Sequence, residues 1–152
     1  MIGSPTLAPF VPAHLDALRP DAPDAAALAG LDRAAFCVRE TGRAATALAA
    51  DGRVLGIGGL ASAADGVHAW ILAGRELRAR HPVALHRWAR AALAALAAEG
   101  HRTVHATVAR DFAAGHRWAA RLGFVPCGGD GERFSTYRLT LAPGKAVPGR
   151  PG

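Results

Sequence analysis

The fold is decided by residues 115–124, with the sequence GHRWAARLGF. Apolar side chains recur from Phe112 to Leu122 at the spacing of one helix face, while arginines occupy the opposite face. Gly123 can adopt the left-handed conformation that ends a helix without a Cβ clash, and Phe124 can then pack back on the last turn. The stretch therefore predicts an amphipathic helix that stops at a glycine and leads directly into a strand.

The residues on either side of this stretch extend the pattern. Pro82 suits the first position of a helix, and apolar residues recur at helical spacing from Leu85 to Leu96 before Gly100 ends the element. Residues 102–108 alternate between polar and apolar side chains, which predicts a strand. Two further strands are expected after the amphipathic helix, over residues 124–127 and 134–141, with a turn over residues 128–131.

The N-terminal third reads as one short strand followed by short helices. Three prolines restrict residues 1–12 to a short edge strand around residues 6–8. Helices are predicted over residues 13–18, 25–29 and 33–39. Asp24 and Asp32 are the expected N-terminal caps of the second and third helices. We expect the third helix to bury the apolar residues Ala35, Phe36 and Val38.

A β-meander follows, with strands over residues 44–49, 54–60 and 67–73. Asp51-Gly52 and Asp65-Gly66 join these strands, and Asp-Gly pairs favour type I′ hairpin turns. The glycine-rich residues 56–59 lie inside the middle strand, so a phosphate-binding loop is not favoured there. We expect these glycines to let the strand bulge or to admit the backbone of a ligand.

This order of elements predicts an α/β (α+β) fold. An antiparallel meander is followed by β-α-β-α-β-β, which gives a mixed sheet with helices on both faces and a right-handed crossover. We predict a single domain over residues 1–141 and a flexible tail over residues 142–152. Ligands in such sheets bind where the strand order splits, beside a helix N-terminus, which points to residues 73–83.

Composition narrows the class of protein. The chain has 152 residues, 51% of them hydrophobic, and a formal net charge of +6. No uncharged apolar run of membrane-spanning length and no secretory signal pattern are present, so we expect a cytoplasmic protein without membrane partners. The two cysteines, Cys37 and Cys127, have neither disulfide-frame nor zinc-site spacing, and His81, His86, His101 and His116 fit no metal-ligand spacing, so no metal is predicted.

The element order, together with Leu122-Gly123-Phe124, resembles the GNAT superfamily of acyl-CoA-dependent N-acetyltransferases over roughly residues 6–141. Residues 51–59 (DGRVLGIGG), 69–72 (AWIL) and 116–118 (HRW) are similar to the small acetyltransferase-like proteins encoded by phages and prophages. The resemblance implies acetyl-CoA and an amine of unknown identity as substrates. It also implies a phage particle or a second copy of the chain as candidate partners, with the virion as an alternative location.

The resemblance also implies which residues contact acetyl-CoA. The backbone of Ile71, Leu72 and Ala73 is expected to pair with the pantetheine amides, and Asp111 lies next to Phe112, where the family often has an asparagine. The family's glycine loop for the CoA diphosphate corresponds here to residues 79–84, which contain no glycine. Arginine binds phosphate through paired N–H donors, so we predict that Arg75, Arg78 and Arg80, with Arg87 nearby, replace that loop. The competing interpretation is that these arginines are ordinary solvated charges near the start of a helix.

The catalytic prediction rests on two residues. His68 is the expected general base, because the family often carries the base on this strand and histidine titrates near neutral pH. His105 and Glu40 are weaker candidates. The family's usual tyrosine position is Ala119, so Tyr137, the only tyrosine of the chain, is the expected acid for the departing thiolate. For each base candidate the competing interpretation is an ordinary edge or surface residue.

Two other functions compete with the enzyme. The missing glycine loop, asparagine and tyrosine suit a catalytically inactive GNAT scaffold that acts as a virion or assembly component. The interpretation as a nucleic-acid-binding protein rests on the net charge alone. It ranks last, because no basic surface with interleaved aromatic residues is apparent.

Overall fold

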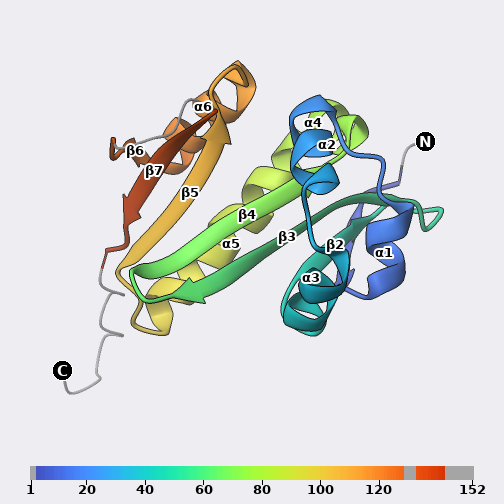
Figure 1. The fold of residues 1–152 in the computed structure, drawn as a ribbon, viewed down its shortest axis with the longest axis horizontal. Helices are drawn as coiled ribbons and strands as arrows, with labels where there is room; N and C mark the ends of the chain where they lie inside the picture. Colours follow the sequence, from blue (N-terminus) through green and yellow to red (C-terminus); the bar gives the residue numbers. More distant parts are fainter. Residues whose placement is uncertain (1–2, 129–132, 143–152) are drawn as a thin grey trace. The chain divides into compact units, whose positions relative to one another are not determined.

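The computed structural model describes residues 3–128 and 133–142 (Figure 1). Its elements are β1 Thr6–Pro9, α1 Pro12–Ala17, α2 Ala22–Ala29, α3 Arg33–Glu40, β2 Ala45–Leu48, β3 Val54–Ala63, β4 Gly66–Ala73, α4 Arg75–Arg80, α5 Pro82–Ala98, β5 Thr103–Ala109, α6 Ala113–Leu122, β6 Val125–Pro126 and β7 Phe134–Thr140. The predicted turn at 128–131 and the predicted tail lie almost entirely outside the described residues.

The strands form a mixed sheet, as predicted. Their hydrogen-bonded order is β1-β2-β3-β4-β5-β7-β6. β1, β2 and β3 pair antiparallel, β4 pairs parallel with β5, and β7 pairs antiparallel with both β5 and β6. The predicted α/β (α+β) class with a mixed sheet is confirmed.

The contacts of the chain divide it into two compact units. We call residues 1–61 and 69–86 the N-terminal unit, and residues 62–68 and 87–152 the C-terminal unit. β4 contributes Gly66–His68 to the C-terminal unit and its last five residues to the N-terminal unit. The single domain predicted over residues 1–141 stays a prediction.

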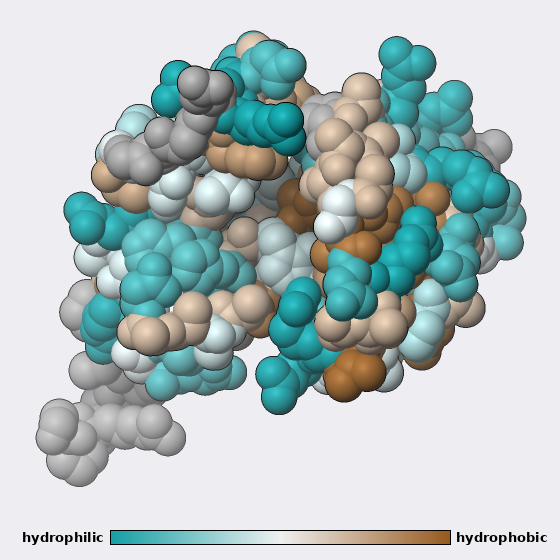
Figure 2. All heavy atoms as spheres, in the orientation of Figure 1, coloured by the Kyte–Doolittle hydropathy of each residue, from teal (hydrophilic) through white to brown (hydrophobic). Residues whose placement is uncertain are grey.

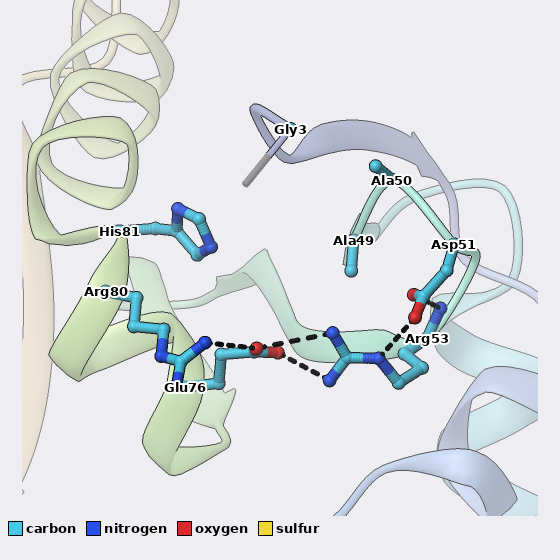
Figure 3. A pocket seen from close by; sticks show the side chains of 8 residues that line it. All are labelled: Gly3, Ala49, Ala50, Asp51, Arg53, Glu76, Arg80 and His81. Atoms are coloured by element: carbon cyan, nitrogen blue, oxygen red, sulfur yellow. Dashed lines mark hydrogen bonds and ion pairs between the residues drawn. The ribbon is translucent and has the colours of Figure 1, made fainter. Parts of the chain in front are cut away.

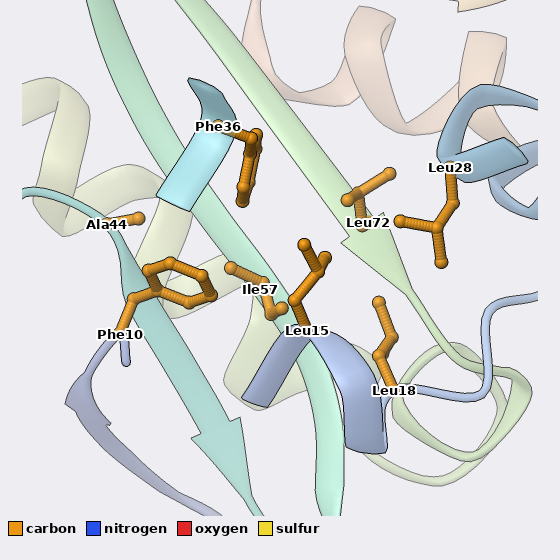
Figure 4. Close-up of a cluster of buried hydrophobic side chains, with 8 residues drawn as sticks. All are labelled: Phe10, Leu15, Leu18, Leu28, Phe36, Ala44, Ile57 and Leu72. Carbon is orange, nitrogen blue, oxygen red and sulfur yellow. The ribbon is translucent and has the colours of Figure 1, made fainter. Parts of the chain in front are cut away.

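The core of the N-terminal unit forms where three short helices pack on β3 and β4. Figure 4 shows side chains from α1, α2 and α3 converging on Ile57 of β3 and Leu72 of β4. The cluster consists of Phe10, Leu15, Leu18, Leu28, Phe36, Ala44, Ile57 and Leu72. Phe36 meets the rings of Phe10 and Trp70 edge-on, at centroid distances of 5.5 and 5.1 Å. Aromatic pairs favour this geometry.

The buried face of α3 differs in part from the prediction. Phe36 is buried, as expected, but Ala35 and Val38 are exposed, Val38 to 86%. The second buried residue is Glu40. Residues four apart share a helix face, so burial of Phe36 brings Glu40 inward and turns Val38 outward. The predicted cap Asp32 is confirmed, because its carboxylate accepts a hydrogen bond from the Ala35 N–H at 3.1 Å.

The glycines of β3 make room for side chains of this protein. A Cβ at Gly59 would lie 2.6 Å from the Trp70 ring, and one at Gly56 would lie 2.7 Å from Leu77 of α4. Because Ile57 points to the opposite side of the strand from Gly56, α4 covers one sheet face and α1–α3 the other within this unit. The expectation that these glycines admit a ligand backbone is therefore wrong at Gly56 and Gly59.

Both hairpins turn through glycine, but not as type I′ turns. Gly52 and Gly66 have positive φ values of 88° and 128°. Positive φ occurs only at glycines among the described residues, so Asp51 and Asp65 do not adopt the conformation that a type I′ turn requires. In the first hairpin the Gly52 N–H donates to the Ala49 carbonyl at 2.9 Å, so the turn closes one residue earlier than predicted.

The C-terminal unit contains the predicted helix stop. Gly123 has φ 102°, and the N–H of Phe124 donates to the Ala119 carbonyl at 3.0 Å. Phe124 and Ala119 are both buried. A Cβ at Gly115 would lie 2.7 Å from Val108 of β5, so this glycine lets α6 approach the strand closely. The stretch that predicted the fold thus holds α6 against β5, as expected.

Some large hydrophobic residues are exposed on the surface, among them Leu7, Val38 and Val83. Figure 2 shows brown residues on the viewed face as small areas surrounded by teal and pale ones. No helix among residues 3–128 and 133–142 is long and apolar enough to cross a membrane.

The packing around Trp70 predicts the effect of a single added methyl group. We expect Gly59→Ala to lower the free energy of unfolding by about 1–3 kcal/mol, since the new Cβ would overlap the Trp70 ring. Gly58→Ala is the matched control, because its Cβ would lie 3.5 Å from the Trp70 carbonyl, an ordinary contact. Urea unfolding followed by tryptophan fluorescence measures both, and equal stability of the two variants would contradict the packing described.

Candidate functional site

Two histidines and an aspartate meet in the C-terminal unit. His68 on β4 and His105 on β5 are paired in the parallel register, and their ring centroids lie 5.2 Å apart. Asp65 in the preceding turn accepts a hydrogen bond from His68 Nε2 at 2.9 Å. The predicted base His68 therefore has a carboxylate that orients its ring, with the weaker candidate His105 beside it.

Hydrogen bonding within this group changes the acidity of Asp65. The pKa of the Asp65 carboxyl lies below its usual value, chiefly because the carboxylate accepts the His68 hydrogen bond. The positive charges that His68 and His105 can carry act in the same direction, more weakly. Asp65 therefore stays ionised to a lower pH than an ordinary aspartate.

The predicted acid Tyr137 is buried on β7 and bonded to a histidine. Its hydroxyl lies 2.6 Å from His116 Nδ1, and His116 Nε2 lies 3.0 Å from the Arg110 carbonyl oxygen. A carbonyl only accepts, so Nε2 carries the hydrogen and donates it. In the neutral ring Nδ1 is then an acceptor, and the Tyr137 hydroxyl donates to it. His116, to which the sequence assigned no role, is thus the direct partner of Tyr137.

The carboxyl end of β4 is held by an aspartate in the N-terminal unit. Asp24 Oδ2 accepts a hydrogen bond from the Ala73 N–H at 2.8 Å and pairs with Arg78 Nη2 at 2.6 Å. The Ala73 carbonyl accepts from the Asp21 N–H at 2.9 Å. The predicted cap Asp24 is wrong: α2 begins after Asp21, whose carboxylate accepts from the Ala22 N–H.

These contacts bear on two predicted acetyl-CoA contacts. Both backbone groups of Ala73 already have partners inside the protein, and the Arg78 side chain is only 17% exposed. Arg75 and Arg80 are exposed on α4, and Ile71 is half-buried while Leu72 is buried. Of the three arginines of this helix, Arg75 and Arg80 remain open to a ligand in solvent.

The other predicted residues lie on both units. Asp111 is exposed in the turn before α6, and Arg87 is exposed on α5, both in the C-terminal unit. The weaker base candidate Glu40 is buried in the N-terminal unit, where its Oε1 accepts from Arg39 Nε at 2.9 Å. Because Glu40 is buried and paired with Arg39, it is poorly placed to contact a substrate.

A pocket of about 220 Å³ opens in the N-terminal unit (Figure 3). It is lined by Gly3, Ala49, Ala50, Asp51, Arg53, Glu76, Arg80 and His81. Arg53 lies between two acids: its Nε donates to Asp51 at 2.8 Å and its Nη1 to Glu76, also at 2.8 Å. These bonds raise the pKa of Arg53 and lower that of Asp51, each chiefly through the hydrogen bond between the two.

Arg80 and His81 give this pocket its basic side. Arg80 Nη1 lies 3.8 Å from Glu76 Oε1, and because this contact is long and the Arg80 side chain is exposed, a phosphate can replace it at little cost. Arg53 is engaged on both sides by carboxylates, so the cation open to an incoming anion here is Arg80. Sequence reasoning identified Arg80 from its position before Pro82, but the Arg53–Glu76 pair joins residues 23 apart and leaves no local signal.

No protein-family model matches this sequence, and no curated protein matches it. Solved structures do match. A GNAT superfamily phosphinothricin acetyltransferase from Sinorhizobium meliloti, in complex with AcCoA, has 18% identity and a TM-score of 0.69 over 95% of this chain and 92% of that chain. The ribosomal-protein-S18-alanine N-acetyltransferase from Escherichia coli has 13% identity and a TM-score of 0.67, over 98% and 100%.

An N-acetyltransferase from Staphylococcus aureus is similar at 15% identity and a TM-score of 0.63, over 92% of this chain and 100% of that chain. At such identities the likeness shows the fold alone, since one fold hosts many functions. The chain therefore has the fold of the GNAT acetyltransferases over nearly its whole length, and the predicted GNAT-like architecture is confirmed.

The Asp24 contacts predict a large loss of stability when the carboxylate is removed. We expect Asp24→Ala to cost about 3–5 kcal/mol, because Arg78 would be left as a nearly buried charge without this partner and the Ala73 N–H without its acceptor. Asp16→Ala is the control: it breaks an exposed pair with Arg33 and should cost about 1 kcal/mol or less. Denaturant unfolding of both variants measures the difference, and similar costs would refute the role assigned to Asp24.

The Asp65–His68 bond predicts a pH dependence. The stabilisation from an aspartate with a lowered pKa is complete above the ordinary carboxyl pKa and is lost as the pH falls through the lowered one. NMR titration of the Asp65 carboxyl carbon should give a pKa that rises in His68→Gln. In His105→Gln it should rise less, because the His105 charge is the weaker cause. An unchanged value in His68→Gln would show that the hydrogen bond does not form in solution.

Proposed function

We propose that this protein is an acyl-CoA-dependent N-acetyltransferase that moves the acetyl group of acetyl-CoA to an amine. The observation that carries the proposal is the likeness to acetyltransferases, which spans 92–98% of this chain and 92–100% of theirs. One of these proteins is in complex with AcCoA. The acceptor amine is left open.

His68 is proposed as the general base. The hydrogen bond to Asp65 keeps the hydrogen of the neutral ring on Nε2, so Nδ1 holds the free electron pair that takes the amine proton. Asp65 is then a positioning residue that fixes the tautomer and stabilises the imidazolium, as carboxylates beside catalytic histidines do.

Tyr137 is proposed as the acid that gives a proton to the departing thiolate. With a neutral His116, the phenol hydrogen is committed to Nδ1. When His116 is protonated, it donates from Nδ1 to Tyr137 and from Nε2 to Arg110, so the phenol hydrogen is released for transfer. His116 thus controls whether the Tyr137 proton is available.

Exposed arginines are proposed to bind the CoA phosphates. Arg75 and Arg80 are free of buried ion pairs, and Arg87 adds a further exposed guanidinium on α5. Arg78 already pairs with Asp24, so we assign it a structural role and not a role in phosphate binding. Ile71 and Leu72 are the proposed pantetheine partners, with Asp111 as a further contact, while pairing at Ala73 requires displacement of Asp24 or Asp21.

We further infer that the protein is of the phage or prophage type. The support is in the sequence motifs of residues 51–59, 69–72 and 116–118. This origin suits a cytoplasmic enzyme in the infected cell, or a component of the virion. A catalytically inactive GNAT scaffold of the particle is the alternative, and it is favoured by the glycine-free residues 79–84 before and within the first turn of α5.

Calorimetry with acetyl-CoA tests the proposal. The protein should bind one equivalent, and Arg80→Ala should weaken binding about tenfold, as expected for the loss of a charged hydrogen bond to phosphate. Arg90→Ala removes an exposed arginine of α5 instead, and as the matched control it should bind like the parent. No binding at millimolar acetyl-CoA would remove the enzyme proposal.

A second measurement separates the enzyme from the scaffold. Incubation with acetyl-CoA and a panel of primary amines, including peptides with free N-termini, should release CoA thiol in proportion to acetylated amine. Binding of acetyl-CoA without acetylation of any amine would favour the inactive scaffold.

A further inference from the structure

We propose that Asp65, His68 and His105 form a binding site for a divalent first-row transition-metal ion such as Zn²⁺. All three residues belong to the C-terminal unit. Each offers one ligand atom, and these atoms lie within 4.8 Å of one another. No local metal-ligand spacing links these residues, because His68 and His105 come from different strands and lie 37 positions apart in the sequence.

The distances suit a metal after a small adjustment. Asp65 Oδ1 and His68 Nε2 are 2.9 Å apart, and they would separate slightly to reach the roughly 3.4 Å between tetrahedral ligands that each lie about 2.1 Å from one ion. The ion would replace the hydrogen now shared by these two atoms. His105 must approach by a rotation of its side chain, and its ring already lies beside that of His68 at a tilt of 30°.

The backbone holds the three residues in place. His68 and His105 are register partners in the β4–β5 pair, and their neighbours Val67 and Val104 are buried. Gly66, with φ 128°, closes the turn that carries Asp65. Two paired strands and a tight turn therefore preorganise the ligands, as metal sites require.

His105 supplies a second observation. Its Nδ1 is buried and has no hydrogen-bond partner among the described residues. Buried ring nitrogens are normally bonded, so the side chain has capacity for a further ligand. Metal binding through one ring nitrogen fixes the tautomer and the orientation of the whole ring.

The ligand chemistry selects the ion. Two imidazoles and one carboxylate suit zinc and its neighbours, whereas Mg²⁺ and Ca²⁺ prefer oxygen ligands throughout. The Asp65 and His68 side chains are 64% and 42% exposed, so the remaining coordination positions are open to water, as in three-ligand zinc sites. Arg138, the cross-strand partner of His105, is exposed, and solvent screens its charge.

This inference goes beyond the proposed acetyltransferase and does not depend on it. A bound ion would occupy His68, so metal binding and proton acceptance by His68 exclude each other. The metal site can therefore be tested without any assay of acetyl transfer, and its failure leaves the proposed function in place.

The test uses untagged, chelator-treated protein carrying Cys127→Ser, since the exposed Cys127 thiol could also bind zinc. Titration with Zn²⁺ by calorimetry, and with Co²⁺ by visible absorption, should show one equivalent bound. Asp65→Asn and His105→Gln should each weaken binding by at least about tenfold. Mg²⁺ should not compete.

His101→Gln is the matched control, because His101 lies 3.7 Å from the Glu99 carboxylate on an exposed surface, without a second histidine in the pair. It should bind metal like the parent. Asp65→Asn changes only an exposed turn, so it keeps the test valid if His105→Gln fails to fold, which circular dichroism reports. No saturable binding, or parent-like binding by Asp65→Asn, would overturn the proposal.

Discussion

The contacts of the Asp24 carboxylate are the ones on which the end of β4 and the start of α4 depend. The carboxylate accepts the last N–H of β4, at Ala73, and pairs with Arg78 of α4, while the Asp21 N–H donates to the Ala73 carbonyl. One carboxylate thus ties the start of α2 to the end of a strand and to the next helix. Because both side chains of the pair are nearly buried, removal of either one would leave the other charge poorly solvated.

This arrangement makes the arginines of α4 differ in exposure. Arg78 is directed inward and serves structure, while Arg75 and Arg80 remain exposed. In the acetyltransferase family that the sequence resembles, the backbone amides of glycines in this segment bind the CoA diphosphate. A chain without those glycines can still attract a diphosphate through side-chain charge, but with less preorganised geometry, since exposed arginines must lose side-chain freedom on binding. Under the proposal that this protein binds acetyl-CoA, the expected consequence is weaker binding than in glycine-loop enzymes.

The histidines of the C-terminal unit have chemistry that is set by their partners. His68 has Asp65 on one nitrogen, which leaves the other open, and His116 is held between a phenol and a backbone carbonyl. The same imidazole group therefore suits a base or metal ligand in one place and a partner for a phenol in the other. The fold shared with acetyltransferases does not decide among these uses, because function depends on the residues of the site.

The sequence by itself determined the local elements. Helical spacing and Gly123 predicted α6 and its stop, Pro82 and Gly100 bracketed α5, and the two Asp-Gly pairs located the hairpins. These features depend on residues within a few positions of one another, so a local sequence pattern is enough to predict them. The order of the predicted helices and strands was enough to predict the mixed sheet.

Only the tertiary structure decided which side chains meet. Asp24 looked like a helix cap because an aspartate near a helix start usually is one, yet its partners lie 49 and 54 residues away. Tyr137 and His116, and the group of Asp65, His68 and His105, likewise form only when strands pair. Pairing across a sheet depends on register between distant segments, and no local spacing encodes register.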